Sequence, residues 1–407
     1  MPGINTESSN RTSSLIVLST LFFMWGFITV INLMLIDELM LAFELDLTEM
    51  LIINLAFFGT YFIISVPAGK LINNIGYKNG IISGVILAGI GCMLYYPAAE
   101  ERSYPLVLLS TFVLASGITI LQVGANPYVV LISRRGTEAS RLTLVQAFNA
   151  LGTVLASLLA IGLFYNLADY SPQAHEAMSP EEIKRSAANY VQLPYLIMGA
   201  VMFLLALLIG FSKLPKVITH EMEPLVKEPE DGPRRFVLQF PHLVLGAVAI
   251  FAYVGAEVTL GTYITRAAED LAKYYWGGAM AGRFLGAFLL MSFSPRKLIG
   301  VFSTIAALLV LTYILSGPAT DPSLWPIIAV GLFNSILFPC IFAMGIHGLG
   351  KFSEEGSSIL IMSIVGGAVI PFIFFNIEST TAAFFLPILC YLYISYYGFK
   401  GSIYKNK

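Results

Sequence analysis

Charged residues and cysteines are scarce in this chain of 407 residues, and each shortage excludes a class of protein. Only 12% of the residues are Asp, Glu, Lys or Arg, whereas an ordinary soluble domain carries about 25%. The chain therefore cannot cover itself with a hydrated surface. Cys92, Cys340 and Cys390 lie far apart in apolar runs, without the spacing of a metal or redox site, so we expect small buried hydrophobic residues.

Groups for catalysis and for nucleic-acid binding are also scarce. The four histidines, His175, His220, His242 and His347, are scattered near the ends of apolar runs or between them, and no ATP-binding loop is visible. A net charge of −2 and a pI near 6.1 give no sign of a nucleic-acid partner. We therefore expect neither an enzyme nor a protein that holds a cofactor or a metal ion.

Long apolar runs are what the chain has instead. Hydrophobic residues make up 57% of it, its mean hydropathy is +0.78, and many runs exceed the roughly 18 residues that indicate a membrane-spanning helix. This predicts an all-α membrane protein whose first run, with no small-residue cleavage site after it, is a retained helix. The twelve predicted spans are 14–36, 50–72, 80–98, 104–132, 142–165, 191–213, 240–265, 272–292, 298–316, 324–348, 356–376 and 382–399.

A charged, proline-rich stretch divides these spans into two sets of six. It reads KLPKVITHEMEPLVKEPEDGPRRF, from residue 213 to residue 236. We therefore predict an N-terminal six-helix bundle over 1–213, a linker over 214–238 and a C-terminal six-helix bundle over 239–407. Equal spacings recur at matching places in the two halves, in the pairs Leu71 and Lys78, Leu290 and Lys297, Gln122 and Pro127, and Asn334 and Pro339. Such a repeat of residue spacings is typical of a transporter with two pseudo-symmetric halves.

Lysine and arginine predict the orientation of the spans. With the N-terminus inside, 18 of the 23 Lys and Arg residues fall in or near cytoplasmic segments and 5 fall outside. The first external loop, DELMLAFELDLTEM, then carries five carboxylates and no basic residue. By the positive-inside rule, both termini and the linker are expected in the cytoplasm.

Six amide side chains lie within the predicted spans, where polar groups are unfavourable unless they find polar partners. An amide that faces lipid costs several kcal/mol, so these groups should point into the bundle or a wet cavity. Gln122 lies four residues before Asn126, and Gln146 lies three before Asn149, so each pair shares a helix face. Such donors and acceptors suit an uncharged, polyhydroxylated solute, although hydrogen bonds that only hold helices together are the alternative. The six are Asn32, Gln122, Asn126, Gln146, Asn149 and Asn334.

One carboxylate, Glu257, lies well inside a span, in the segment FAYVGAEVTLGTYI. An ionised glutamate is strongly disfavoured there, so its protonation should be accessible, as proton coupling requires. A glutamate held by an arginine or placed in an aqueous vestibule is the alternative. Arg283, in AGRFLG, is expected to reach the cytoplasmic surface or to pair with Glu354 or Glu355, in the role of a gate. Trp25, Tyr253 and Phe338 are candidates to stack on the apolar face of a sugar ring.

Several segments resemble the fucose–proton symporter family of the major facilitator superfamily, and within it the bacterial glucose/galactose transporters. They run in order through most of the chain: FFMWGFITVINLML, AFFGTYFIISVPAGKLINNIGYKNGI, LASGITILQVGANPYVVL, SRLTLVQAFNALGT, YVGAEVTLGTYI, YWGGAMAGRFLGAFLL and LFNSILFPCIFAMGIHGLG. GKLINNIGYK also resembles the loop motif of the superfamily, with Asn73 at its usual acidic position, and we assign its Lys78 to gating together with Arg283.

The resemblance implies a two-half, twelve-helix fold and sugar uptake by alternating access, usually driven by protons. Gln146 and Asn149 match the sugar-contacting amides of the family, and Asn126 matches the asparagine of its Asn-Pro pair. The sequence departs from the family where Leu33 and Gln122 stand in place of two acids, and where Phe338 replaces a tyrosine of the fucose symporter. Glu257 then remains as the acid within the membrane.

These observations predict a monomeric secondary transporter in the bacterial inner membrane. The solute is expected to be a monosaccharide, glucose or galactose and alternatively fucose, bound by the amides between the halves. Glu257 is expected to carry the coupling proton. A sodium-coupled symporter and an uncoupled facilitator stay open as alternatives, and a membrane sugar receptor without transport is the alternative from another class.

Overall fold

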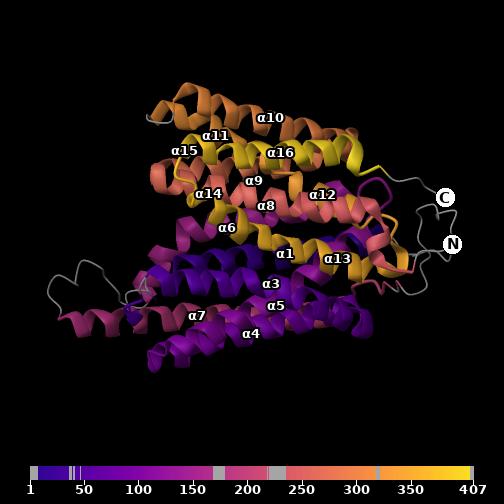
Figure 1. Cartoon of the computed structure of the whole chain (residues 1–407). Helices are drawn as coiled ribbons and strands as arrows, with labels where there is room; N and C mark the ends of the chain where they lie inside the picture. Colours follow the sequence, from indigo (N-terminus) through magenta and orange to yellow (C-terminus); the bar gives the residue numbers. More distant parts are fainter. Residues whose placement is uncertain are drawn as a thin grey trace.

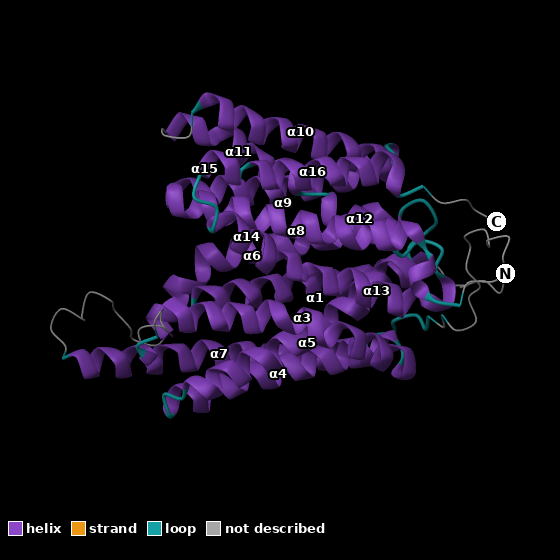
Figure 2. Cartoon of the chain, viewed as in Figure 1, coloured by secondary structure: helices purple, strands orange, loops and turns teal. Residues whose placement is uncertain are grey.

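The computed structural model of the chain describes residues 8–35, 39, 42–45, 47–167, 179–217, 219, 235–317 and 321–403. All regular structure in these residues is helical (Figure 2). Each of the twelve predicted spans coincides with a helix or with a chain of short helices. The all-α prediction is therefore confirmed. Most of the linker, together with His175 and His220, lies outside the described residues.

The first six spans are uninterrupted helices. Their apolar composition favours the helix, because lipid leaves backbone polar groups no other partner. The α7 helix also begins with a capping box, in which the Glu182 backbone N–H donates to Ser179 Oγ and the Ser179 backbone N–H donates to the Glu182 carboxylate. The helices are α1 (Ser8–Met34), α3 (Leu47–Ile75), α4 (Tyr77–Glu100), α5 (Tyr104–Ile132), α6 (Glu138–Leu167) and α7 (Pro180–Phe211).

The last six spans begin with three continuous helices and end with three interrupted ones. The continuous helices are α8 (Pro241–Ala267), α9 (Glu269–Ser292) and α10 (Pro295–Ser316). The tenth span consists of α11 (Asp321–Asn334) and α12 (Leu337–Gly345), the eleventh of α13 (Ser353–Met362), η4 (Ser363–Val365) and α14 (Gly366–Phe375), and the twelfth of α15 (Thr380–Ala383), α16 (Phe385–Tyr396) and the π-helical turn η5 (Tyr397–Gly401). Short 3-10 turns, η2 (Val237–Gln239) and η3 (Gly350–Phe352), precede α8 and α13.

The helices form two bundles that lie side by side (Figure 1). In the N-terminal bundle α4 packs on α5 and α7, and α1 packs on α6; in the C-terminal bundle α8 packs on α14 and α16, and α9 packs on α11. The bundles meet where α6 contacts α9 and α12, and where α3 and α5 contact α13. The start of α1 and the end of α16 lie at the same end of the molecule, as an even number of crossings requires (Figure 1).

Ten of the twelve spans are long and apolar enough, among the described residues, to cross a membrane by length and composition alone. The other two are α6 and α9, the helices that pack against each other between the bundles. Both helices carry polar side chains within their spans, including Gln146 on α6 and Arg283 on α9. These two polar side chains therefore lie at the contact between the bundles, away from the lipid, as expected for polar groups within spans.

Hydrogen bonds join the bundles near the end of the molecule at which α7 ends and α8 begins, which we call the linker end. Ser140 Oγ of α6 donates to the Ala287 carbonyl of α9 at 2.7 Å. Ser357 Oγ of α13 donates to the Val123 carbonyl of α5 at 2.9 Å. Opening a path at the linker end would have to break both bonds.

Candidate functional site

A row of linked amides crosses three helices of the N-terminal bundle. Gln146 Nε2 of α6 donates to Asn126 Oδ1 of α5 at 3.0 Å, and Asn126 Nδ2 donates to the Gln122 carbonyl one turn earlier at 3.0 Å. Gln122 Nε2 in turn donates to Tyr61 Oη of α3 at 2.9 Å. The structure thus brings together Gln122, Asn126 and Gln146, which the sequence placed on shared helix faces. We call these three residues and Tyr61 the amide row.

The amide row keeps free acceptors. Gln122 Oε1 and Gln146 Oε1 have no hydrogen-bond partner among the described residues, and neither is among the side-chain atoms sealed from solvent without a partner. Both residues are nonetheless largely buried, at 5% and 6% exposure. The two oxygens therefore reach accessible surface deep inside the protein and can accept a hydrogen bond from a bound molecule.

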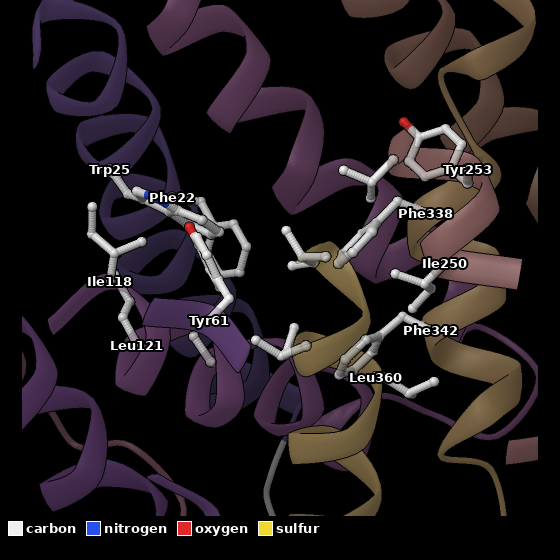
Figure 3. Close-up of a cluster of buried hydrophobic side chains, with 14 of the residues drawn as sticks. Phe22, Trp25, Tyr61, Ile118, Leu121, Ile250, Tyr253, Phe338, Phe342 and Leu360 are labelled. Atoms are coloured by element: carbon white, nitrogen blue, oxygen red, sulfur yellow. The ribbon is translucent and has the colours of Figure 1, made fainter. Parts of the chain in front are cut away.

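Asn149 lies one turn beyond Gln146 on α6 and contacts α1. Its Nδ2 donates to the Phe22 carbonyl at 2.9 Å, and its side chain is half-buried. Trp25 lies on the same stretch of α1, with its ring 5.2 Å from that of Phe22. Figure 3 shows Phe22, Trp25 and Tyr61 grouped on the N-terminal bundle, and Tyr253 and Phe338 grouped on the C-terminal bundle. The predicted aromatic residues thus come from both bundles.

Asn32 has a different environment from the amide row. Its Oδ1 accepts a hydrogen bond from Tyr195 Oη of α7 at 2.9 Å, and the Tyr195 ring stacks on Tyr95 at 3.8 Å between centroids. Both tyrosine side chains are buried within the N-terminal bundle. This contact is of the helix-joining kind that the sequence left open as the alternative.

Asn334 likewise bonds to tyrosines, in the C-terminal bundle. Tyr391 Oη of α16 donates to Asn334 Oδ1 at 2.9 Å, and Asn334 Nδ2 donates to Tyr275 Oη of α9 at 2.9 Å. Asn334 is fully buried, and it is the last residue of α11, where the tenth span is interrupted. Both polar atoms of its side chain therefore have partners inside the bundle.

The embedded acid Glu257 faces Arg283. Arg283 Nη2 of α9 lies 4.0 Å from Glu257 Oε1 of α8, with side-chain exposures of 15% and 13%. The expectation that Arg283 reaches the surface or pairs with Glu354 or Glu355 is therefore wrong, because the guanidinium points toward the nearer buried charge. The alternative for Glu257, a glutamate held by an arginine, is the arrangement observed. Arg283 Nη1 also lies 3.4 Å from the Gln146 carbonyl, which it faces as a donor across the two bundles.

Three buried polar atoms around this pair lack hydrogen-bond partners among the described residues: Glu257 Oε1, Arg283 Nε and Tyr253 Oη. Tyr253 lies one turn before Glu257 on α8, and its hydroxyl is close to the carboxyl. The Tyr253 ring lies 6.4 Å from Phe338 of α12. An unpaired buried polar group costs about 1–3 kcal/mol, so a cluster of three indicates a site that another species occupies or in which groups rearrange.

Lys78 lies at the linker end of the N-terminal bundle. Its Nζ donates to the carbonyls of Gly210 and Ser212, each at 2.8 Å, and so satisfies the last carbonyls of α7. Tyr128 Oη of α5 donates to the Pro215 carbonyl at 2.7 Å, which holds the start of the linker against the same bundle. The role of Lys78 as a gate stays a prediction.

Three residues of the site were not singled out by sequence reasoning: Tyr61, Tyr275 and Tyr391. Each donates to or accepts from a polar group that was singled out. In a chain with 20 tyrosines, the sequence contains no signal that separates these three from the rest. Among the described residues, no group of three His, Cys, Asp or Glu side chains could hold a metal ion.

Comparison with known proteins agrees with this architecture. Residues 16–374 match the model of the family described as Major Facilitator Superfamily. The chain is 41% identical to the glucose/galactose transporter of Brucella abortus, over 98% of this chain and 97% of the relative. It is 32% identical to the L-fucose-proton symporter of Escherichia coli, over 93% of this chain and 90% of the relative.

Among solved structures, the chain is similar to the crystal structure of FucP, a Major Facilitator Superfamily transporter in the outward conformation. The TM-score is 0.81 at 32% identity, and the match covers 94% of this chain and 97% of the other. This likeness confirms the predicted fold of two pseudo-symmetric six-helix bundles, and the relatives are transporters, which confirms that the chain is not an enzyme. The chain belongs to the major facilitator superfamily and is a multi-pass membrane transporter.

Proposed function

We propose that the protein imports a monosaccharide, glucose or galactose, by proton-coupled alternating access. The observation that carries the proposal is the amide row, whose Gln122 and Gln146 oxygens are free to accept from sugar hydroxyls. A hydroxyl both donates and accepts, and amides offer both functions without burying a charge. The names of the two relatives above support the same class of solute.

The solute would lie between the bundles, against the amide row and Asn149. Trp25 on one side and Tyr253 and Phe338 on the other would cover its apolar faces. Asn334, predicted as a ligand, is proposed instead as a support of the wall, because tyrosines occupy both polar atoms of its side chain. Asn32, also predicted as a ligand, is proposed as a support because its Oδ1 accepts from Tyr195 within the N-terminal bundle. Sugar binding by the remaining residues is the part of the proposal that mutation tests.

Glu257 would carry the proton. When Glu257 is ionised, the guanidinium of Arg283 compensates its charge. When Glu257 is protonated, Arg283 is free to move away from it, toward the solute, from the side on which it already faces the Gln146 carbonyl. Sodium is the less favourable ion, because it would bind a few ångströms from the Arg283 cation, and like charges repel strongly over that distance in a medium of low polarity. A proton binds to the carboxylate itself and needs no vacant coordination shell.

The two bundles, over residues 1–213 and 239–407, would rock about this site, with residues 214–238 as the cytoplasmic linker. The hydrogen bonds at the linker end keep that end closed, which corresponds to an outward-facing state if the linker is cytoplasmic, as the distribution of Lys and Arg indicates. We propose a monomer in the bacterial inner membrane with both termini in the cytoplasm.

Transport by the purified protein in proteoliposomes tests the proposal. We expect glucose or galactose to drive an alkaline shift outside the vesicles, with or without sodium, and Glu257→Gln to abolish accumulation while retaining exchange of labelled for unlabelled sugar. Glu355→Gln, which changes an exposed carboxylate on α13, is the matched control. Accumulation that survives in Glu257→Gln contradicts the coupling assignment, and fucose outcompeting glucose and galactose in exchange contradicts the solute assignment.

A further inference from the structure

An unbroken chain of hydrogen bonds leads from α16 to the backbone of Glu257. Tyr391 Oη donates to Asn334 Oδ1 at 2.9 Å, Asn334 Nδ2 donates to Tyr275 Oη at 2.9 Å, and Tyr275 Oη donates to the Glu257 carbonyl at 3.0 Å. The three linking side chains are fully buried. The chain joins the four helices α16, α11, α9 and α8, and every link has a distinct donor and acceptor. We call it the tyrosine–asparagine chain.

The interruption of the tenth span supports the middle of this chain. The α11 helix ends at Asn334 and α12 begins at Leu337, while Ser335 Oγ donates to the Leu332 carbonyl at 2.6 Å and so occupies one of the carbonyls near the break. A break at mid-span leaves backbone groups without their usual helical partners, so it is tolerated only where the surroundings hold it. Tyr275 and Tyr391 hold Asn334 from two sides.

The tyrosine–asparagine chain also connects the helices that carry Glu257 and Arg283. Tyr275 and Arg283 lie on the same helix, eight residues and about 12 Å apart. Through its hydroxyl, Tyr275 fixes α9 against α8 at the residue that carries the carboxyl. The separation of 4.0 Å between Arg283 Nη2 and Glu257 Oε1 therefore depends on a contact made elsewhere along α9. A small displacement of α9 changes this separation directly.

The other groups around Glu257 leave Arg283 as its only charged neighbour in the described part of the chain. Tyr253 of α8 brings a hydroxyl, and Tyr275 of α9 bonds only to the backbone carbonyl. The surfaces of α12 and α14 that pack on α8 are apolar there, with Phe338 against Tyr253 and Ile370 against Gly255. Glu354 of α13 is bonded to Thr219 near the linker end. Among the charged groups of the described residues, Arg283 is thus the one whose distance can change proton binding by Glu257.

We propose that Asn334 is a positioning residue of proton coupling, which acts with Tyr275 and Tyr391 to set the separation of Arg283 from Glu257 and hence the pH dependence of transport. The proposal rests on the proposed function of Glu257 as the proton carrier. Asn334 does not touch the sugar in this scheme. Loss of a hydrogen bond in the tyrosine–asparagine chain lets α9 move away from α8. The Glu257 carboxylate then loses part of the electrostatic compensation by Arg283 and takes up a proton at a higher external pH.

Tyr391→Phe is the sharpest test, because it removes one hydroxyl at the far end of the chain and leaves the volume of the core unchanged. We expect the pH of half-maximal uptake to move upward by about half a unit or more, equivalent to a change of about threefold in proton affinity. The KM for sugar should change less than twofold. Tyr275→Phe should produce a shift in the same direction and a larger one, because it removes the bond to Glu257 itself.

Tyr313→Phe is the matched control. Tyr313 is a buried tyrosine of the same bundle, and its hydroxyl bonds at 2.7 Å to Tyr263, which lies six residues beyond Glu257 on α8 and outside the tyrosine–asparagine chain. It should lower thermal stability to a similar degree and leave the pH profile unchanged. If Tyr391→Phe and Tyr313→Phe give the same profile, Asn334 only supports the fold and the proposal is overturned.

Two further outcomes distinguish a failure of the role proposed for Asn334 from a failure of the role proposed for Glu257. A rise in KM with an unchanged pH profile in Tyr391→Phe would make Asn334 part of the sugar site and overturn its role in coupling. Continued accumulation by Glu257→Gln would overturn the proton carrier itself, whatever the tyrosine variants do. If Tyr391→Phe does not fold, Tyr275→Phe measured against Tyr313→Phe gives the same decision.

Discussion

The two bundles solve the problem of burying polar groups in different ways. In the N-terminal bundle the spans are continuous, and the polar groups are neutral amides that bond to one another, to Tyr61 and to backbone carbonyls. In the C-terminal bundle three spans are interrupted, and the polar groups include the pair Glu257 and Arg283. A neutral amide needs one or two partners, whereas a buried charge needs a fixed opposite charge in a fixed frame.

This difference indicates a division of labour. Groups that recognise a neutral solute can exchange protein partners for solute hydroxyls at little cost, because one hydrogen bond replaces another. Groups that bind a proton must have their geometry held by something that does not move with the solute. The tyrosine–asparagine chain lies only in the C-terminal bundle, beside the charges. We therefore expect substitutions in the N-terminal bundle to change sugar affinity and substitutions in the C-terminal bundle to change proton coupling.

Removal of the Arg283 charge should have the largest effect. Arg283→Met leaves Glu257 buried and uncompensated, which costs about 3–5 kcal/mol when a buried pair is broken in this way. We expect accumulation to be lost and thermal stability to fall, measured by vesicle uptake and by thermal unfolding in detergent. Lys273→Met, at an exposed position of the same helix, is the control.

The double variant Arg283→Met with Glu257→Gln sharpens this result. With both charges removed, no unpaired charge is left inside the membrane, so stability should return toward that of the parent while accumulation stays absent. Stability that remains as low as in Arg283→Met alone would show that the arginine acts through its packing and its approach to the Gln146 carbonyl, not through the charge of Glu257.

Gln146→Leu should weaken sugar binding without a change in coupling. It removes the bond to Asn126 and the free oxygen, and a loss of one to two hydrogen bonds predicts a KM about tenfold higher. Arg283 faces the backbone carbonyl of Gln146, which leucine retains. The pH of half-maximal uptake should therefore stay constant. A shifted pH profile with an unchanged KM for sugar would contradict the assignment of sugar binding to the N-terminal bundle and of proton coupling to the C-terminal bundle.

A pair of glycine substitutions compares the packing of the two bundles directly. A Cβ at Gly152 of α6 would lie 2.1 Å from the Phe23 carbonyl oxygen of α1, and a Cβ at Gly331 of α11 would lie 2.2 Å from the Tyr275 carbonyl oxygen of α9. Both alanine variants should lose about 1–3 kcal/mol of stability through overpacking. Only Gly331→Ala pushes apart helices of the tyrosine–asparagine chain, so only this variant should shift the pH profile. An equal shift of the pH profile in Gly152→Ala would contradict the assignment of proton coupling to the C-terminal bundle alone.

The sequence predicted the spans and the shared amide faces well, because both are local properties. An apolar run of sufficient length is a helix in lipid wherever it packs, and the spacing of Gln122 from Asn126 fixes their common face before any tertiary contact forms. The bond between Gln146 and Asn126 followed from two such faces on neighbouring helices.

The partners of the charges could not be predicted in this way. Arg283 meets Glu257 because α9 packs beside α8, and Asn334 is enclosed because α11 stops at that residue between two tyrosines. Neither fact is encoded in a local pattern. A tyrosine hydroxyl at the end of a rigid ring can reach a partner on any neighbouring helix, so the tertiary arrangement alone selects Tyr61, Tyr275 and Tyr391.

The smallest predicted effect concerns the contact between the linker and the C-terminal bundle. The Thr219 hydroxyl donates to Glu354 Oε1 of α13, while Tyr128 and Lys78 hold residues 210–215 to the N-terminal bundle. Thr219→Val removes this connection between bundles at constant volume. A loss of about 1 kcal/mol should raise the population open at the linker end about fivefold.

Cys340 provides a native reporter of this opening. Its side chain is fully buried in α12 and lies against Thr143 of α6, so its thiol is shielded by the contact between bundles. N-ethylmaleimide should therefore label Cys340 about fivefold faster in Thr219→Val than in the parent, if labelling follows the open population. Cys92, buried inside the N-terminal bundle, should stay unlabelled in both. Ser395→Ala, which removes a hydroxyl bond within the C-terminal bundle alone, should leave the rate unchanged. Equal rates in Thr219→Val and Ser395→Ala would mean that the direct bonds of Ser140 and Ser357 close the linker end without help from the linker.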